Sequence, residues 1–475
     1  MDFTTDYRML IDGKMVAGAG EIDVVNPATG EKIAAAPDCS AAQLDDAVAA
    51  ARRAFPGWKA TPIEQRSALL KAAAGVFMEN ADALMRVLTS EQGKPHGDAI
   101  GEMMGSAYWL ATVADMTLPV TVSEDTPERL SETRRVPLGV VGAISPWNFP
   151  VILSVWKIAP ALLAGNTMVL KPSPFTPLAV LKIGELLAGI FPPGVLNIVT
   201  GGDALGPMIT AHKGIDKISF TGSSATGRRV MESASKDLKR ITLELGGNDA
   251  AIVLPDADVA KVAEKLFWAS FYNAGQVCIA AKRIYIHEDI YDELSAAIAA
   301  YASAVKVGDG AEQGTAIGPI QNKQQYNRVL ELIADAKDKG YKFLVGGDHD
   351  PSIPGYFVPV TVLDNPPEDA RIVAEEQFGP VMPLMKFSTV DEVISRANAS
   401  DYGLAGSIWT SNPEAAVAVA EQLETGTVWI NESMHLAPNA PFAGHKQSGF
   451  GAELGEEGLL EFTYPQVITI AREAA

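Results

Sequence analysis

The stretch VPLGVVGAIS, residues Val136–Ser145, is a short apolar run that ends in a polar residue, and it begins the alternation that decides the fold. Four more apolar runs follow, separated by segments with helical character: Thr167–Lys171, Val195–Val199, Lys217–Phe220 and Ile241–Glu244. Strands that alternate with helices in this way predict a parallel, doubly wound sheet. Since ligands bind at the carboxyl ends of such strands, the polar residues after each run are the first candidates for a site.

A second alternation of strands and helices surrounds Cys278. Its expected strands are Arg283–Ile286, Val381–Phe387, Leu404–Trp409 and Gly426–Ile430. The chain has 475 residues, a length that suggests about two or three domains. We therefore expect a second α/β domain built around this cysteine.

The residues before the first sheet are predicted to form a scaffold without chemistry of its own. Tyr7–Val16 should form a hairpin that turns at Asp12-Gly13. Two helices should follow, each with capping-box spacing at its start: Ser40 with Gln43 for a helix through Phe55, and Thr61 with Glu64, with Pro62 at the first helical position, for a helix through Val76.

Two segments are candidates for contacts between subunits. Leu118–Arg135 is charged and poor in turn residues, which favours an extended arm. Tyr464–Ile470 is rich in β-forming residues, and an exposed strand of this kind needs a partner. It either folds onto its own domain or, as we predict, joins a sheet of a neighbouring subunit near the arm, in a homodimer or homotetramer.

Composition excludes several classes of partner. The 38 basic and 58 acidic residues give a net charge of -20, which repels nucleic acid and anionic membrane surfaces. No apolar run approaches the length of about 18 residues that a spanning helix needs, and the start of the chain lacks the pattern of a secretory signal. With only Cys39 and Cys278, neither a disulfide framework nor a metal site is expected, and a cytoplasmic location follows as the default.

The motif Asn273-Ala274-Gly275-Gln276-Val277-Cys278-Ile279 places a cysteine directly after a glycine-containing turn. A partly ionised thiol is a strong nucleophile, but it needs a base and a site that stabilises an oxyanion. The alternative interpretation of Cys278 is a small buried hydrophobic residue. Other motifs favour the nucleophile.

Two of these motifs carry groups suited to acyl chemistry. Asn148, in Ser145-Pro146-Trp147-Asn148-Phe149-Pro150, has an uncharged amide that can donate to a developing oxyanion, although a plain proline turn would look the same. Glu244, in Leu243-Glu244-Leu245-Gly246-Gly247-Asn248, ends an apolar strand. Apolar walls raise the pKa of a carboxyl toward the range of a general base, whereas a solvated loop acid would keep an ordinary pKa.

Two other motifs are suited to a dinucleotide. Phe220-Thr221-Gly222-Ser223-Ser224-Ala225-Thr226-Gly227 joins a strand to a helix through a glycine turn, and backbone donors at a helix start bind phosphate. Glu376-Gln377-Phe378-Gly379-Pro380 sets an acid beside an aromatic ring, an arrangement that would hold a ribose and cover a flat ring.

Together these motifs, in this order around Cys278, closely resemble the aldehyde dehydrogenase superfamily over essentially the whole chain. The resemblance implies an NAD(P)-dependent, non-acylating enzyme with Cys278 as nucleophile, Glu244 as general base, and Asn148 with the Cys278 amide as the oxyanion site. It implies a Rossmann-type domain in residues 1–117 and 138–246, a catalytic domain in 247–447, and an oligomerisation arm with the C-terminal strand in 118–137 and 448–475.

The same resemblance implies two sets of binding residues. The expected cofactor set is Ser145, Trp147, Lys171, Ser173, Gly202, Gly206, Phe220, Thr221, Gly222, Ser223, Leu245, Glu376 and Phe378. The expected substrate pocket is Phe149, Ile152, Leu153, Trp156, Tyr272, Val277, Ile279, Met434, His435, Leu436 and Phe442, and for any one of these an ordinary core position is the alternative.

The chain departs from the family pattern at two informative positions. Pro174 stands where members that prefer NAD commonly carry a glutamate, so NAD is expected with NADP possible. Trp156 stands where relatives that take acidic semialdehydes tend to carry an arginine, so the resemblance implies an apolar or aromatic aldehyde. Two other functions remain open from the residues: a cysteine hydrolase that needs no cofactor, and a binding protein without turnover.

Overall fold

The larger sheet of the computed structural model, which describes residues 2–472, has eight strands in the order β2-β1-β9-β8-β7-β10-β11-β21. The bounds are β1 Met9–Ile11, β2 Lys14–Val16, β7 Val140–Ile144, β8 Thr167–Lys171, β9 Leu196–Ile198, β10 Lys217–Thr221, β11 Arg240–Glu244 and β21 Gly449–Phe450. The five central strands, β9 to β11 in this order, pair in parallel, and antiparallel strands close both edges. The predicted parallel sheet and the N-terminal hairpin β1-β2 are confirmed.

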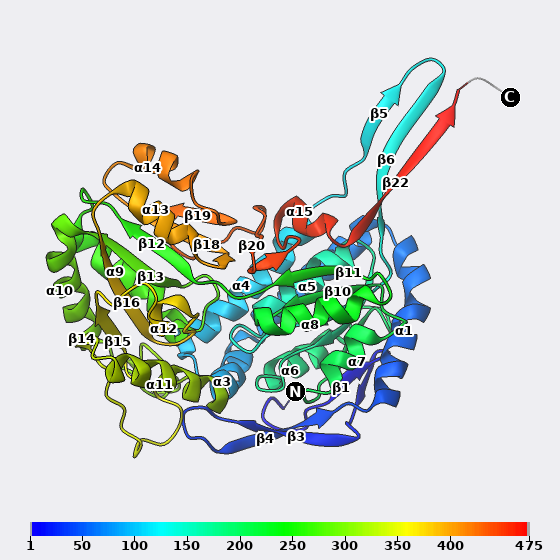
Figure 1. The fold of residues 1–475 in the computed structure, drawn as a ribbon. Helices are drawn as coiled ribbons and strands as arrows, with labels where there is room; N and C mark the ends of the chain where they lie inside the picture. The colour runs from blue at the N-terminus through cyan, green and yellow to red at the C-terminus, as the bar shows by residue number, and fades with distance from the viewer. Residues whose placement is uncertain (1, 473–475) are drawn as a thin grey trace.

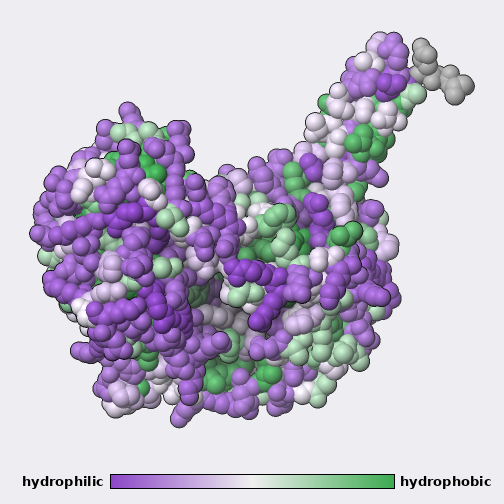
Figure 2. All heavy atoms as spheres, in the orientation of Figure 1, coloured by the Kyte–Doolittle hydropathy of each residue, from purple (hydrophilic) through white to green (hydrophobic). Residues whose placement is uncertain are grey.

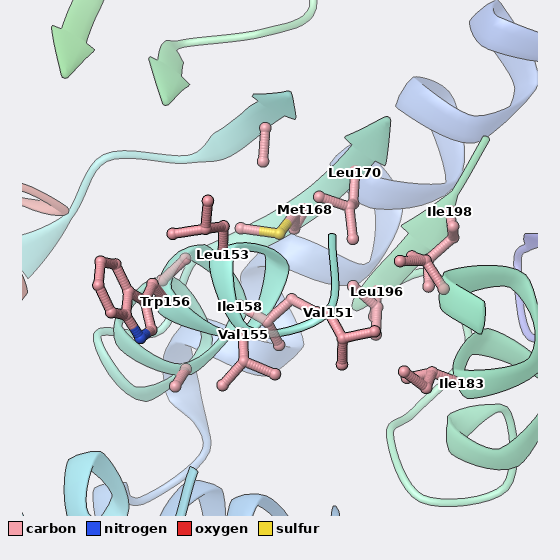
Figure 3. Packing of buried hydrophobic residues seen from close by; sticks show 14 of the residues in the cluster. Val151, Leu153, Val155, Trp156, Ile158, Met168, Leu170, Ile183, Leu196 and Ile198 are labelled. Carbon is pink, nitrogen blue, oxygen red and sulfur yellow. The ribbon is translucent and has the colours of Figure 1, made fainter. Parts of the chain in front are cut away.

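Helices cover both faces of this sheet (Figure 1). They are α1 Ala41–Ala60, α2 Ile63–Glu79, α3 Ala81–Gln92, α4 His96–Ala114, α5 Ile152–Leu163, α6 Leu178–Leu187, α7 Leu205–Ala211 and α8 Ser224–Ser235. The helix α5 is buried along almost its whole length. Figure 3 shows its side chains converging with those of β8, β9 and α6 in one apolar layer, which fixes the loop before α5 against the sheet.

The start of α1 agrees with the sequence prediction, and the start of α2 does not. Ser40 and Gln43 form the reciprocal capping box of α1. This helix continues past Phe55 to Ala60 with Pro56 inside it. At α2 the N-cap is Pro62, whose side chain cannot accept a hydrogen bond. The Thr61 hydroxyl does not cap this helix either, since it donates back to the carbonyl oxygen of Gly57 in α1 at 3.0 Å. The capping box predicted at Thr61 is therefore wrong.

A second sheet has the order β14-β15-β16-β13-β12-β18-β19, parallel except for β14. Its strands are β12 Asp249–Val253, β13 Ala281–His287, β14 Lys342–Val345, β15 Thr361–Asp364, β16 Val381–Phe387, β18 Ala405–Trp409 and β19 Thr427–Ile430. Its helices are α9 Val259–Phe271, α10 Glu288–Ala304, α11 Lys323–Asp338, α12 Arg371–Ala374, α13 Val390–Asn398 and α14 Pro413–Ala420. The four predicted strands are present, and β12, β14 and β15 are additions that the sequence analysis missed.

The remaining short elements lie at the edges of these two sheets. They are the hairpin of β3 Gly20–Val25 with β4 Lys32–Asp38, the pair of β17 Tyr402–Gly403 with β20 His445–Lys446, and α15 Gly455–Leu460. Figure 2 shows a mainly hydrophilic face, with hydrophobic residues in the recess at the centre of the view and on the projecting arm. No helix within residues 2–472 combines the length and the apolar character that crossing a membrane requires.

The arm is a three-stranded antiparallel sheet that projects from the body (Figure 1). Its strands are β5 Thr121–Asp125, β6 Arg129–Pro137 and β22 Thr463–Ala471. The strand β22 pairs with β6 along its whole length, with Val467 opposite Thr133. Within its own chain β22 follows α15 and pairs with β6 at one edge of the arm, and because β22 is an outer strand of this sheet, its joining of a neighbour's sheet stays a prediction.

Candidate active site

The loop that carries Cys278 has an unusual backbone that only particular residues allow. After α9, Asn273, Ala274 and Gly275 adopt left-handed conformations in succession, with φ of 50°, 56° and 72°. A Cβ on Gly275 would lie 2.2 Å from the carbonyl oxygen of Gly379, so a larger residue is excluded there. After this turn, just before β13 of the second sheet, Cys278 is half-buried and lines both of the cavities described below.

Asn148 lies beside this loop, between β7 and α5. Its side-chain Nδ2 donates to the backbone carbonyl oxygen of Gln276 at 3.0 Å, and its backbone carbonyl oxygen accepts from Asn273 Nδ2 at 3.0 Å. A buried lysine, Lys94, also donates to that carbonyl oxygen at 3.0 Å and pairs with Glu102. One N–H of the Asn148 side-chain amide is thereby bonded to Gln276, two residues before Cys278, and the second N–H is left for a ligand.

Glu244 ends β11, and its carboxyl is buried at 3% exposure. Burial, the largest cause, and the nearby Glu453 carboxyl raise its pKa well above the usual range, while Lys157 opposes them. Lys157 itself donates to Glu453 and to Thr221 Oγ1. The predicted rise in the pKa of Glu244 is confirmed, and the alternative of a solvated loop acid is excluded.

Among the residues that the structure describes, the two Glu244 carboxylate oxygens have no hydrogen-bond partner, and Glu244 does not border either cavity. A carboxylate that must take a proton from water at Cys278 has to come within about 3 Å of that water. The side chain therefore has to rotate toward the cavity before it can act as a base.

The polar cavity has a volume of about 580 Å³ and carries most of the predicted cofactor residues. The predicted cofactor residues that line it are Trp147, Thr221, Gly222, Ser223, Leu245, Glu376 and Phe378. The remaining lining residues are Pro146, Asn148, Leu153, Phe175, Gly246, Cys278, Asn322, Gln324, Gln325, Asn327, Arg328 and Glu331. Ser223 caps α8 by accepting from Thr226 N at 3.3 Å. The rings of Trp147 and Phe378 meet edge to face with centroids 5.3 Å apart.

Six predicted cofactor residues do not line the polar cavity: Ser145, Lys171, Ser173, Gly202, Gly206 and Phe220. Ser145 bonds Ser154 at 2.8 Å, and Phe220 lies under Gly222. Burial lowers the pKa of Lys171 to about 8, opposed by Asp203 and Asp38. Ser173 Oγ accepts from Phe175 N, and Gly202 N donates to Asp38. Gly206 lies inside α7.

The apolar cavity, of about 300 Å³, contains the whole predicted substrate pocket. Its lining residues are Phe149, Ile152, Leu153, Trp156, Tyr272, Val277, Ile279, Met434, His435, Leu436 and Phe442, with Asn148, Cys278 and Trp109. Phe149 stacks on Tyr272 with centroids 6.0 Å apart. Trp109, which the sequence analysis missed, packs on Trp156 at 5.7 Å. None of these described lining residues is an arginine or lysine.

The thiol of Cys278 is poorly ionised in this arrangement. Burial raises its pKa to about 12; Lys282 opposes this, and Asp249, Glu244 and Glu376 add to it. Within residues 2–472 no group of three His, Cys, Asp or Glu side chains is placed to hold a metal ion. The groups available for chemistry at this junction are therefore a thiol, an amide donor, a high-pKa carboxyl and two cavities of opposite character.

Comparison with known proteins identifies the family of the chain. The model of the aldehyde dehydrogenase family matches residues 15–468. A phenylacetaldehyde dehydrogenase of Pseudomonas fluorescens is 39% identical over 98% of this chain and 96% of that protein. An aldehyde dehydrogenase from Bacillus cereus, solved as an NAD+ complex, superposes with a TM-score of 0.96 at 36% identity over 99% of this chain and 98% of that one. An NADP-dependent enzyme from E. coli superposes at 0.95, with 36% identity and 98% of both chains covered.

The family model spans nearly the entire chain, and the relative and the solved structures cover it at more than 30% identity. Both sheets and the arm are thus part of one shared fold. The chain belongs to the aldehyde dehydrogenase family.

Proposed function

We propose that Cys278 is the nucleophile of an aldehyde oxidation, with Asn148 and the Cys278 backbone N–H as the oxyanion site and Glu244 as the base for hydrolysis. The observation that carries this assignment is that Cys278 and Asn148 line both cavities. A substrate in one cavity and a cofactor in the other then face the same sulfur. The cofactor-independent hydrolase, by contrast, leaves the polar cavity without a role.

In the first stage the Cys278 thiol gives its proton to solvent, and the thiolate Sγ bonds to the aldehyde carbon while the carbonyl π electrons move to oxygen. The free N–H of Asn148 stabilises that oxyanion, a contribution that amounts to about 3 kcal/mol in related sites. Loss of a hydride from the adduct leaves an acyl group on Sγ. The nicotinamide ring, when bound, supplies the acceptor for this hydride.

In the second stage a water molecule attacks the thioester on Cys278. Glu244, rotated toward the cavity, takes a proton from that water, and because its pKa is raised it binds that proton more strongly than an ordinary carboxylate does. The carbonyl oxygen again becomes an oxyanion beside Asn148, the C–S bond breaks, and the carboxylic acid leaves. One amide therefore serves both stages.

The polar cavity fits a dinucleotide on its donors and its flat walls. Ser223 and the backbone N–H groups at the start of α8 are placed for a pyrophosphate, and Glu376 accepts hydrogen bonds as a ribose hydroxyl requires. We propose NAD as the main cofactor with NADP accepted. Pro174 carries no carboxylate to repel a 2′-phosphate, while Lys171, with its lowered pKa, is a weakened partner for one.

We propose an uncharged apolar or aromatic aldehyde as the substrate. The apolar cavity is walled by aromatic rings, and the relative from Pseudomonas fluorescens is named for an aromatic aldehyde. Oxidation that depends on added NAD, followed by the absorbance of the reduced cofactor, tests the function. Equal acid formation without the cofactor would leave only the hydrolase.

We further propose the division into domains given by the sequence and a homodimer or homotetramer in the cytoplasm. The arm exposes Val122, Val467 and Ile470, with 62% of Val467 open, on a sheet whose outer strands β5 and β22 have unpaired edges. Both cysteines are free, as expected in a reducing compartment.

Deleting the residues after Phe462 should lower the assembly to monomers in sedimentation, because β22 is an outer strand of the arm and its removal leaves β6 paired with β5 alone. Val467→Asp is the milder control, since it changes the exposed surface and keeps the strand. An unchanged mass for both variants would contradict assembly through the arm.

A further inference from the structure

Lys282 is a buried lysine four residues after Cys278, at the start of β13. Its ammonium donates to the carbonyl oxygen of Cys278 at 2.6 Å and lies 3.4 Å from Glu376 Oε1, with 3% of the side chain exposed. A charge taken out of water needs close partners, and these two are the ones it has gained. One ammonium thus joins the backbone of the nucleophile to the carboxylate of the polar cavity.

This arrangement depends on a close approach at Gly247. The Gly247 N–H donates to Glu376 Oε1 at 3.1 Å, so the same carboxylate oxygen is shared with Lys282. A Cβ on Gly247 would lie 2.7 Å from the Cys278 carbonyl oxygen. The carbonyl, the glycine and the carboxylate are therefore packed around the ammonium without room for another group.

The charges around the Cys278 thiol are unbalanced without Lys282. Glu244 at the end of β11, Asp249 at the start of β12 and Glu376 before β16 all oppose a negative sulfur. Among the charged groups that act on the thiol in residues 2–472, Lys282 is the positive one. It also opposes the rise in the pKa of Asp249, which burial brings to about 7, and of Glu376.

We propose that Lys282 is a positioning residue that allows Cys278 to ionise, because its ammonium offsets the charge of the thiolate while it holds the Cys278 carbonyl and Glu376 in place. The inference rests on the proposed role of Cys278 as the nucleophile. It requires no contact between Lys282 and the substrate.

The test is the rate of alkylation of Cys278 by iodoacetamide against pH in the cofactor-free protein, with the labelled peptide identified by mass spectrometry. The thiolate sulfur bonds to carbon, iodide leaves, and the thiol proton passes to the buffer. In Lys282→Met and Lys282→Gln the rate at neutral pH should fall about tenfold or more, since one unit of pKa is a factor of ten in thiolate. Lys282→Arg, which keeps the charge, should recover most of the rate.

Several outcomes separate this role from a structural one. Lys217→Met is the matched control, because Lys217 is also buried, bonds Thr242 and Glu461, and should leave the alkylation profile unchanged. An alkylation profile that changes in Lys282→Met but not in Lys282→Gln would overturn the electrostatic role, because glutamine lacks the charge but can still donate to the Cys278 carbonyl oxygen. An alkylation profile unchanged in every Lys282 variant would overturn it as well. If the unmodified protein is not labelled at Cys278 at all, the proposed function fails before this inference is reached.

Discussion

The cavity on one side of Cys278 is bordered by Glu376, Arg328 and Glu331, whereas the cavity on the other side is bordered by aromatic and aliphatic side chains. The first can hold a charged dinucleotide through hydrogen bonds, and the second desolvates whatever enters it. Charged side chains and the apolar pocket that we propose for the substrate therefore lie on opposite sides of one sulfur. The polar groups that line both cavities, Cys278 and Asn148, are then the ones whose loss should affect the reaction most.

The largest effect is expected from Cys278→Ala, which should abolish oxidation of every aldehyde while the affinity for NAD, measured by titration calorimetry, stays nearly unchanged. The sulfur makes the covalent bond to substrate, but the polar cavity holds the cofactor through other groups. Cys39→Ala is the control, because Cys39 is a buried thiol that lines neither cavity and donates to the Ser40 carbonyl oxygen. Oxidation that survives in Cys278→Ala would end the assignment.

Asn148→Ala should lower kcat by about 10²–10³-fold, as expected when one donor to an oxyanion is removed. Because the amide serves acylation and deacylation, the loss should appear both in a single turnover and in the steady state. Asn327→Ala, at an exposed position of the polar cavity, should change kcat little. A drop confined to the steady state would mean that Asn148 acts in hydrolysis alone.

A smaller effect, on specificity, is expected from Trp156→Arg in the apolar cavity. An aldehyde with a carboxylate loses its hydration there and meets no cation, so the unmodified enzyme should oxidise it poorly. The new guanidinium should raise kcat/KM for the acidic substrate relative to an aromatic one by about tenfold, equivalent to roughly 1.4 kcal/mol. Trp156→Leu separates the loss of the indole from the gain of charge. A native preference for the acidic aldehyde would contradict this description of the cavity.

The sequence predicted the residues of the apolar cavity well because they lie close to Asn148 and Cys278 along the chain or in one later loop. It missed Trp109, which α4 brings in from a distant segment, and Lys282, which looks like an ordinary residue of a buried strand. The electrostatic effect of Lys157 and Glu453 on Glu244 was also out of reach. That effect comes from side chains about 90 and 200 residues away, which no local spacing reveals.

Fold prediction succeeded where apolar runs were continuous and failed where local chemistry was ambiguous. The strands β8 and β16 have the predicted bounds. The strand β12, Asp249–Val253, was missed because it follows β11 after only a short loop, so that its residues were not distinguished from the end of the β11 run. The C-terminal strand was recognised, but its pairing with β6 of the same chain was not, because that pairing depends on where α15 delivers the strand.

The central claim is that the acyl group passes through a thioester on Cys278 when both cavities are filled. The most direct measurement is the intact mass of Glu244→Gln after mixing with an aromatic aldehyde and NAD, followed by peptide mapping, because this variant should acylate and then stall. We expect one acyl group per active site on the peptide that contains Cys278, together with about one equivalent of reduced cofactor. No adduct, or an equal adduct without NAD, would contradict it.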